Sequence, residues 1–446
     1  MTLDEWLAFQ QRQHSDAIAL GLDRVREVAR RLGLARPARR VVTVAGTNGK
    51  GSTVAFVEAI ARAAGLRVGA YTSPHLLAYN ERVRIDGIDA GDSALIKAFV
   101  AIEAARTGGA SQGPDGSART DGKVSMASVA SAEGTAIPLT YFEYGTLAAL
   151  WLFERASLDL AILEVGLGGR LDAVNIVDAD VAIITTVDLD HQVLLGDDRE
   201  TIGVEKAGIM RAGRPVVLAE SDPPASVLRH AYAIGASAIR AGCDYLIDAT
   251  DGGWRWREVG YEVDLPQPAL AAPAQRANAA AAIAALRSLD IAIDETAIIA
   301  GVRSARVRGR LQMAFRDGVP IVFDVAHNPQ AARQLAQWLA SHPVPGATLA
   351  VFSALADKDL HGIVAPVCAH VAHWWLCGLH DTPRGLSAPE LAGRLQGVLD
   401  TGTCEPVADV RAALAAARAR ASTADRILVF GSFHTVADAL RVLPDE

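Results

Sequence analysis

The sequence predicts an α/β protein of two domains, the first with a mostly parallel sheet and the second a smaller α/β unit. The chain has 446 residues, more than a single hydrophobic core usually serves. Half of the residues are hydrophobic and 21% are charged, which is the balance of a folded protein. In both halves, short apolar runs alternate with helix-like segments, a pattern typical of parallel strands that are buried on both faces.

The first domain is expected to span residues 1–300. Its apolar run 41–45 stops at Gly46 and is followed by a helical apolar pattern over 53–64, which predicts a strand, a tight loop and a helix. Polar residues that follow parallel strands meet at the carboxyl edge of the sheet, where ligands bind. The other strands expected in this domain are 68–71, 158–165, 181–187 and 214–219.

Residues 107–136 differ in composition from the rest of the chain. They are rich in Gly, Ser, Ala and Thr, so we expect a surface insertion without a catalytic part. The strand and helix pattern restarts after Ser288, and we place the domain boundary between 299 and 309. The second domain is therefore expected at 301–446, with strands at 321–325, 349–353, 374–377 and 427–430.

Charge and cysteine content limit the classes of function. The formal net charge of −8 argues against binding along a nucleic-acid backbone. The start of the chain lacks a basic segment followed by an apolar run, and no apolar stretch reaches the ~18 residues that span a bilayer. The four cysteines are scattered without metal-ligand spacing, which fits a reducing cytosol. We therefore expect a cytoplasmic protein without nucleic-acid or membrane partners.

The segment from Gly46 to Ser52 has the composition of a phosphate-binding loop. Its three glycines allow backbone N–H groups to approach a triphosphate, Lys50 can reach the outer phosphates, and the Ser52 hydroxyl can bind Mg²⁺. The spacing departs from the common pattern, because Gly51 separates the lysine from the serine. A chance glycine-rich turn is the alternative, but the position between a strand and a helix favours ATP. The expected ATP contacts are Asn48, Gly49, Lys50, Gly51 and Ser52.

Three more polar residues are ambiguous when taken singly. Glu164 follows a buried strand and could be a metal ligand or a helix-capping acid. His191 could be a ligand or an ordinary hydrogen-bonded polar residue. Lys206 could serve as a simple counter-cation beside phosphates, which is the better interpretation from residue type alone.

Further motifs follow the loop in order and cover nearly the whole chain outside the insertion. They lie at residues 71–76, 81–84, 140–146, 163–172, 189–191, 205–209, 309–310, 324–329 and 431–435. In order and spacing, this set resembles the folylpolyglutamate synthase and dihydrofolate synthase family, a branch of the Mur ligase superfamily. The resemblance implies an N-terminal P-loop-containing, Mur-ligase-like ATPase domain and a C-terminal Rossmann-like glutamate ligase domain.

The resemblance also implies a reaction. A substrate carboxylate would attack the γ-phosphate of ATP to give an acyl phosphate, which the amino group of L-glutamate then attacks. Such phosphoryl transfer depends on positioning and charge neutralisation, and the family uses Mg²⁺ and responds to K⁺. The implied metal ligands are Ser52, Ser73, Glu164, His191 and Lys206, with Lys206 carbamylated, and the implied catalytic residues are Lys50, Glu164, His191 and Lys206.

Two further groups of residues match ligand contacts of the family. Those implied to contact the nucleotide are Asn278, Arg310, Asp324 and His327, the arginine and aspartate from across the domain cleft. Those that match the dihydropteroate-binding segments are Asp23, Arg24, Thr140, Tyr141, Phe142, Asp172 and Asn175.

Two departures from the family pattern affect neighbours of these residues. Gln192 and Val193 stand where Thr and Asp usually follow the histidine, and Val174 stands where Thr is common. Any hydrogen bonds from the missing side chains must come from elsewhere.

The expected function is therefore ATP-dependent addition of L-glutamate to dihydropteroate and to tetrahydrofolate or its glutamates, by a monomer. A folylpolyglutamate synthase without the first activity is one alternative, and a cell-wall Mur ligase is another. A nucleotide-dependent switch is the alternative from a different class, but the chain has no Asn-Lys-x-Asp guanine-reading motif.

Overall fold

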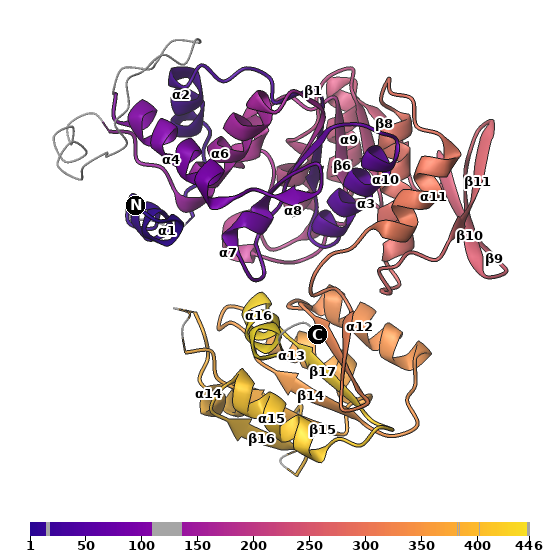
Figure 1. Cartoon of the computed structure of the whole chain (residues 1–446). Coiled ribbons are helices and arrows are strands. Elements are labelled where there is room, and N and C mark those ends of the chain that lie inside the picture. Colours follow the sequence, from indigo (N-terminus) through magenta and orange to yellow (C-terminus); the bar gives the residue numbers. More distant parts are fainter. Residues whose placement is uncertain (15–17, 109–135, 381, 383, 401, 444–446) are drawn as a thin grey trace. The chain divides into compact units, whose positions relative to one another are not determined.

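The computed structural model describes residues 1–14, 18–108, 136–380, 382, 384–400 and 402–443 (Figure 1). Nearly all of the expected insertion at 107–136 lies outside these residues. The chain divides into two compact units. The first unit contains residues 1–75, 79–266 and 278–303, and the second contains 76–78, 267–277 and 304–446.

An eight-stranded sheet forms the centre of the first unit, in the order β4-β3-β2-β5-β1-β6-β7-β8. The six strands from β2 to β8 in that order pair in parallel, and β3 and β4 pair antiparallel at one edge. The prediction of a mostly parallel sheet is confirmed. The strands are β1 (Ala38–Ala45), β2 (Val68–Tyr71), β3 (Val83–Ile85), β4 (Ile88–Asp89), β5 (Leu158–Glu164), β6 (Val181–Ile184), β7 (Pro215–Leu218) and β8 (Ser237–Arg240).

Helices surround this sheet. Helix α3 packs against β1, β2 and β5, α4 packs against α6, and α8 packs against α9. In the described part of the chain, no helix has both the length and the apolar character that crossing a membrane requires. The helical elements are α1 (Leu3–Gln10), α2 (Asp23–Arg31), α3 (Lys50–Ala63), η1 (Tyr79–Arg82), α4 (Asp92–Arg106), α6 (Tyr141–Arg155), η3 (Ala173–Ile176), α7 (Gln192–Leu195), α8 (Arg199–Ala207), α9 (Ala225–Ile234), α10 (Gln275–Arg287) and α11 (Glu295–Ser304).

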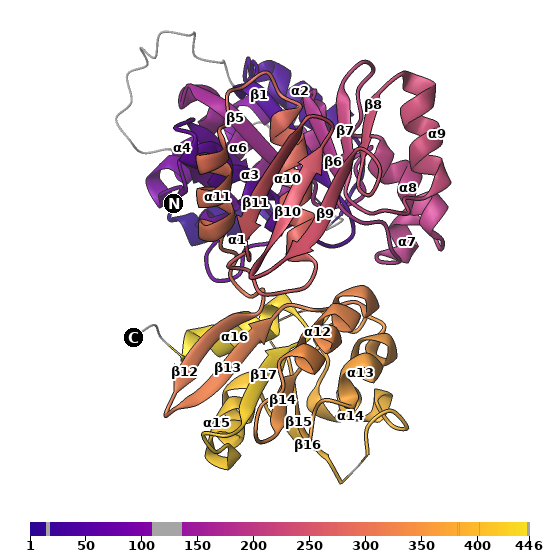
Figure 2. The same cartoon turned by 90° about the vertical axis from the view of Figure 1, so that its right-hand side faces the viewer.

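A three-stranded antiparallel sheet was not expected from the sequence. It consists of β9 (Tyr245–Thr250), β10 (Gly253–Glu258) and β11 (Tyr261–Pro266) and lies beside α10 (Figure 2). On β10, Trp254 and Trp256 are buried, and the Trp256 indole N–H donates to the Ala280 carbonyl oxygen at 3.2 Å. Trp256 therefore anchors this sheet to α10.

The second unit has a six-stranded sheet with helices on both faces. Ala350 and Leu428 point into one core with α12, α13 and α14, whereas Val351 and Val429 point into the other with α15 and α16. Parallel pairing of five strands in the order β13-β17-β14-β15-β16 confirms the Rossmann-like prediction. The elements are β12 (Gln312–Arg316), β13 (Val319–Asp324), α12 (Pro329–Ser341), β14 (Thr348–Phe352), α13 (Leu360–Cys368), β15 (His373–Cys377), α14 (Ala388–Arg394), β16 (Cys404–Val407), α15 (Val410–Arg420), β17 (Arg426–Phe430) and α16 (Phe433–Val442).

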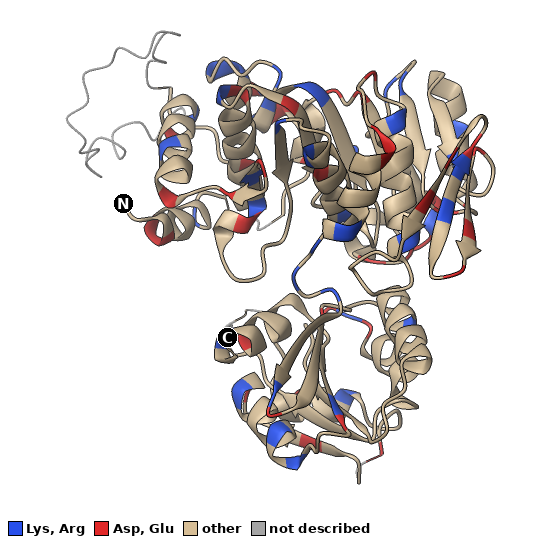
Figure 3. Ribbon diagram, turned by 45° about the vertical axis from the view of Figure 1, so that its right-hand side comes forward, with Lys and Arg blue, Asp and Glu red and all other residues tan. Residues whose placement is uncertain are grey.

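Basic and acidic residues are interspersed along the elements of each unit (Figure 3). On the three-stranded sheet, for example, Arg255 pairs with Asp264 at 2.7 Å.

Candidate active site

The loop between β1 and α3 is held by the end of β6. The Thr185 hydroxyl donates to the Asn48 carbonyl oxygen at 2.6 Å, and the Thr47 N–H donates to the Thr186 carbonyl oxygen at 2.7 Å. Gly46 has a φ of 150°, and a Cβ there would lie 1.8 Å from the Thr185 hydroxyl oxygen. Only glycine fits this close approach of loop and strand.

Asn278 of α10 lies against the same loop. Gly49 has a φ of 90°, and a Cβ added to it would lie 2.6 Å from the Asn278 side-chain oxygen. Asn278 is 5% exposed, so its amide is a buried polar group beside the phosphate loop. Its predicted contact with the adenine is compatible with this position.

Lys50 and Ser52 open the 14-residue helix α3. The Lys50 ammonium donates to the carbonyl oxygens of Gly46 and Thr47, at 2.9 and 3.2 Å, so it curls over the loop. The helix N-terminus adds partial positive charge. These features suit the outer phosphates of a nucleotide.

Glu164 ends β5 and lies beside the start of α3. It is 4% exposed, and its carboxylate accepts the Ser73 N–H at 2.9 Å. A Cβ on Gly51 would lie 3.7 Å from one carboxylate oxygen and 3.8 Å from the other. The structure therefore brings Glu164 close to Ser73 and to the Ser52 helix turn, and hard oxygen donors of this kind suit Mg²⁺.

The candidate metal centre is not a cluster of acids and histidines. Among the described residues, no group of three or more His, Cys, Asp or Glu side chains is placed to hold a metal ion. The predicted set instead combines two hydroxyls, the Glu164 carboxylate, the His191 imidazole and a modified Lys206. The donors fit a divalent cation by chemistry, and the Ser73 backbone N–H already contacts the Glu164 carboxylate.

Lys206, near the end of α8, is 3% exposed. Burial and the nearby Lys50 ammonium lower its pKa to about 7, while Asp190 and Glu220 act in the opposite direction. A large part of the amine is therefore neutral near neutral pH, the form that reacts with CO₂.

The segment that carries His191 is fixed on two sides. The Thr47 hydroxyl exchanges hydrogen bonds of 3.0 Å with the backbone of Asp188, which links the segment to the phosphate loop. On the other side the Val187 N–H donates to the Glu220 carboxylate at 3.1 Å. His191 itself has a φ of 51° and caps α7.

Sequence reasoning missed Glu220 and its partner Arg199. The Arg199 guanidinium donates to the Val187 carbonyl oxygen at 2.7 Å and to Glu220 at 3.2 Å. Glu220 comes two residues after β7, so the strand-end rule that selected Glu164 would also have selected it.

Phe142 and Asp172 meet at Gly166. A Cβ on Gly166 would lie 2.6 Å from the Phe142 ring and 3.3 Å from the Asp172 carboxylate. Asp172 accepts the backbone N–H groups of Leu167 and Val174 at 2.9 and 3.1 Å, and burial raises its pKa to about 7. Val174 thus contacts Asp172 through its backbone, which does not require the usual threonine.

Other residues predicted to bind the pterin also have structural contacts. The Thr140 hydroxyl caps α6 by accepting the Glu143 N–H at 3.2 Å, and Glu143 in turn accepts from Arg24 at 3.0 Å. Asp23 is the first residue of α2, and the Tyr141 ring is half-buried at the start of α6. Their substrate roles stay predictions.

The Asn175 amide is occupied by the protein. It donates to the carbonyl oxygens of Arg170 and Gly208, at 3.0 and 3.1 Å, and accepts from Arg211 at 2.9 Å. Asn175 therefore ties the glycine-rich loop to the end of α8, and its contact with substrate stays a prediction.

In the second unit, Arg310 and His327 lie beside the Phe433 ring, and Asp324 is near Arg310. The Arg310 guanidinium and the His327 ring are 5.6 and 5.8 Å from the Phe433 ring centre. Asp324 accepts two backbone N–H groups at 2.9 Å each, and burial raises its pKa while Arg310 lowers it. Three predicted nucleotide contacts are thus together at the end of β13.

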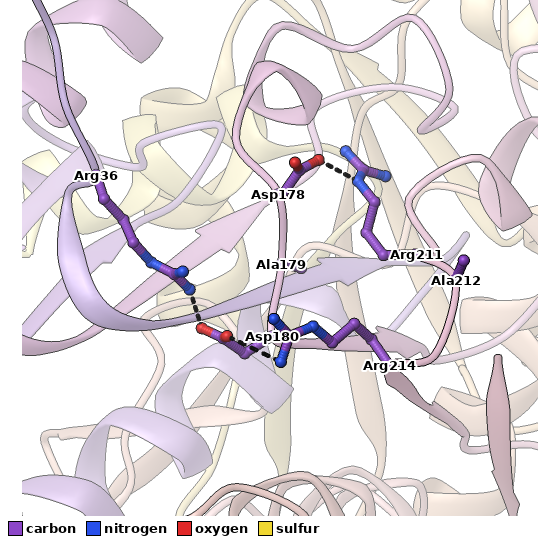
Figure 4. A pocket seen from close by; sticks show the side chains of 7 residues that line it. All are labelled: Arg36, Asp178, Ala179, Asp180, Arg211, Ala212 and Arg214. Atoms are coloured by element: carbon purple, nitrogen blue, oxygen red, sulfur yellow. Dashed lines mark hydrogen bonds and ion pairs between the residues drawn. The ribbon is translucent and has the colours of Figure 1, made fainter.

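A hollow of about 280 Å³ lies in the first unit, at the amino ends of β1, β6 and β7 (Figure 4). This is the edge of the sheet opposite to the phosphate loop. Asp180 pairs with Arg36 and Arg214, and Arg211 pairs with Asp178. These ion pairs of three arginines with two aspartates connect the amino ends of three strands, which indicates a structural role.

Comparisons with known proteins show what the chain is similar to. Residues 309–433 match the family model described as Mur ligase, glutamate ligase domain. The Escherichia coli K12 protein named dihydrofolate synthase/folylpolyglutamate synthase is 43% identical over 442 residues, covering 99% of this chain and 95% of that protein.

Solved structures are similar over the same length. A structure of E. coli FolC in complex with DHPP and ADP has a TM-score of 0.88 at 43% identity, covering 99% of this chain and 98% of that chain. A bifunctional folylpolyglutamate synthase/dihydrofolate synthase with Mn, AMPPNP and L-glutamate bound has a TM-score of 0.86 at 42% identity, with coverage of 99% and 98%. This chain belongs to the dihydrofolate synthase/folylpolyglutamate synthase family of ATP-dependent ligases.

Proposed function

We propose that this protein joins L-glutamate to dihydropteroate, and to tetrahydrofolate or its glutamates, with conversion of ATP to ADP and phosphate. The observation that carries the proposal is the junction of the Gly46–Ser52 loop with buried Glu164 and Lys206. A nucleotide-binding loop alone would serve many activities, whereas a buried carboxylate at the start of α3 and a buried lysine near Lys50 with a depressed pKa suit carboxylate activation. Family membership over the full chain supports the same reaction.

The residues divide the work between binding and chemistry. The loop and Lys50 hold the outer phosphates, so that the substrate carboxylate attacks the γ-phosphate and forms an acyl phosphate. The amino group of glutamate then attacks the acyl carbon and phosphate leaves. Phe142 offers an apolar ring surface to the pterin, and Asp172 offers a carboxylate to its edge.

A divalent metal ion is implied by the relative that contains Mn and AMPPNP. We propose Mg²⁺ held by Ser52, Ser73, Glu164, His191 and carbamylated Lys206; when bound, it would neutralise charge on the phosphates. A response to K⁺ is also proposed on family grounds. The carbamate is testable as a carbon-13 signal from protein supplied with labelled CO₂, and an unmodified ammonium would contradict it.

Nucleotide contacts by Asn278, Arg310, Asp324 and His327 complete the proposal. We also propose a monomer in the cytoplasm, the latter supported by four scattered thiols. The high identity to proteins named for both activities favours a bifunctional enzyme over one limited to polyglutamate extension.

The test is product analysis by mass spectrometry with two acceptors in parallel. The protein is mixed with ATP, L-glutamate and either dihydropteroate or tetrahydrofolate, and ADP is measured in the same samples. Glutamate addition to both acceptors, with ADP release that depends on the acceptor, is expected. Extension of tetrahydrofolate alone would favour the single-activity alternative, and ADP release without a folate product would contradict the proposal.

A further inference from the structure

Arg82, at the end of η1, is a buried arginine that forms no ion pair within the described part of the chain. It is 8% exposed, and its guanidinium makes one hydrogen bond, from Nε to His75 Nδ1 at 2.9 Å. Among the described residues, neither of its terminal nitrogens has a hydrogen-bond or ion-pair partner. Burial of a charge in this state is unfavourable unless something else compensates it.

Other arginines in the same unit are compensated. Arg84, two residues further on, makes a two-pronged contact with Glu58 at 2.8 and 3.0 Å. Arg106 is as buried as Arg82 and pairs with Glu103 at 2.7 Å through both Nε and a terminal nitrogen. In the sequence motif at 81–84, Arg84 therefore stabilises the fold, whereas the terminal guanidinium nitrogens of Arg82 can still donate to a ligand.

Aromatic rings fix the Arg82 guanidinium in place. It lies 5.3 Å from the centre of the Tyr79 ring and 5.4 Å from that of the Tyr141 ring. Tyr79 and Tyr141 themselves contact edge to face, with ring centres 5.6 Å apart. Cation–π contact holds the plane of the guanidinium but leaves its terminal N–H groups for another acceptor.

The position of Arg82 connects it with the candidate active site. Its backbone carbonyl accepts the N–H of Thr72, the residue before Ser73, and Tyr141 directly precedes Phe142. The Tyr71 ring centre is 5.9 Å from that of Phe142, and Tyr71 interacts electrostatically with both Arg82 and Asp172. Arg82 thus lies in the same neighbourhood as the predicted pterin contacts.

We propose that Arg82 recognises the carboxylate of the acid substrate, binding its two oxygens through the terminal guanidinium nitrogens. This inference rests on the proposed function and names the residue that selects an acid over its neutral analogue. A planar guanidinium fixed between rings matches the planar carboxylate in a two-pronged contact. The anion would also supply a counter-charge that no described residue provides to Arg82 through an ion pair.

The experiment is a two-by-two cycle of protein and ligand. Wild type and Arg82→Gln are titrated calorimetrically with dihydropteroate and with its carboxamide, in the presence of ADP so that no turnover occurs. Wild type should prefer the acid by about 10- to 100-fold, the range for a hydrogen bond to a charged group. Arg82→Gln should lose this preference while it keeps its affinity for the carboxamide, and Arg82→Lys should retain part of the preference.

A structural role would give a different result. If Arg82 only supports the tyrosines, Arg82→Gln weakens both ligands equally and the preference for the acid survives, which overturns the proposal. Arg155 serves as a matched control, because it stacks on the Trp151 ring at 3.8 Å but is half-exposed on α6. Arg155→Gln should leave both affinities unchanged. Wild-type protein that binds neither ligand would contradict the proposed function instead.

Discussion

The two units each end a central strand with a buried carboxylate, but they surround it differently. Glu164 ends β5 and faces the start of a helix that carries Lys50, and Lys206 is near enough to feel the charge of Lys50. Asp324 ends β13 and is held by two backbone N–H groups; burial raises its pKa, and Arg310 is the cation that opposes this rise.

This difference separates chemistry from binding. The first unit concentrates charges of both signs and a lysine with a depressed pKa, as expected where a reacting group must be activated. The second unit offers a backbone-fixed carboxylate and a guanidinium near the Phe433 ring, which suits holding a ligand. Substitution of Glu164 in the first unit should therefore act on kcat, and substitution of Arg310 in the second unit on KM for the nucleotide.

Glu164→Gln should have the largest effect. The amide oxygen can still accept the Ser73 N–H, so the fold should persist, but the charge that faces the helix start is lost. We expect kcat to fall by about 100-fold or more, since even partners of metal ligands contribute 10- to 100-fold. The measurement is steady-state ADP release, with thermal unfolding as the check on folding. Exposed Glu262→Gln on β11 is the control, and a near-normal kcat for Glu164→Gln would contradict the division between the units.

Arg310→Ala comes next in size. The substitution removes the guanidinium beside Phe433. The Asp324 carboxylate should stay in place, because its hydrogen bonds come from backbone N–H groups. We expect kcat/KM for ATP to fall about 10- to 100-fold, mainly through KM, as for loss of charged hydrogen bonds to phosphate. Arg418→Ala, on the exposed face of α15, should be neutral. A near-normal kcat/KM in Arg310→Ala would refute its predicted role.

Most of the parallel strands could be predicted because they are continuous apolar runs, whereas the parallel strands β8 and β16 were missed because they are partly exposed. The expected strand at 68–71 is β2 to the residue, and the run 158–165 ends one residue beyond β5. The sheet of β9, β10 and β11 was missed because its strands are half-exposed and alternate in polarity. Asp251-Gly252 between two alternating segments was a usable hairpin signal. Residues 267–277 belong to the second unit only through tertiary contacts, which no local pattern encodes.

Site residues could be predicted where they follow strands, as Glu164 and Asp324 do. The sequence could not predict that Asn278 would lie on Gly49, because 229 positions separate them and only the folded chain brings them together. It also gave no means to distinguish Arg82 from Arg84, since their difference depends on whether a carboxylate from α3 reaches them.

Lys206→Met tests the smallest effect, the stability cost of the buried lysine. In the folded protein the Lys206 pKa is lowered to about 7, whereas an exposed lysine titrates near 10.5. Between these values the unfolded chain holds a proton that the folded chain has released, so the free energy of unfolding of wild type rises with pH across this window. Below pH 7 both states are protonated and the cost of burial is complete.

Methionine removes this titration. The free energy of unfolding of Lys206→Met should therefore exceed that of wild type most at low pH, and by less as the pH rises. Urea unfolding at pH 6 and pH 9, in buffers free of CO₂, should show an advantage that is about 1–3 kcal/mol larger at pH 6. Exposed Lys97→Met should show the same difference from wild type at both pH values. An advantage of Lys206→Met that does not change with pH would mean that the lysine keeps its proton in the folded protein. The first unit would then lack the neutral amine that sets its charge cluster apart from Asp324 and Arg310.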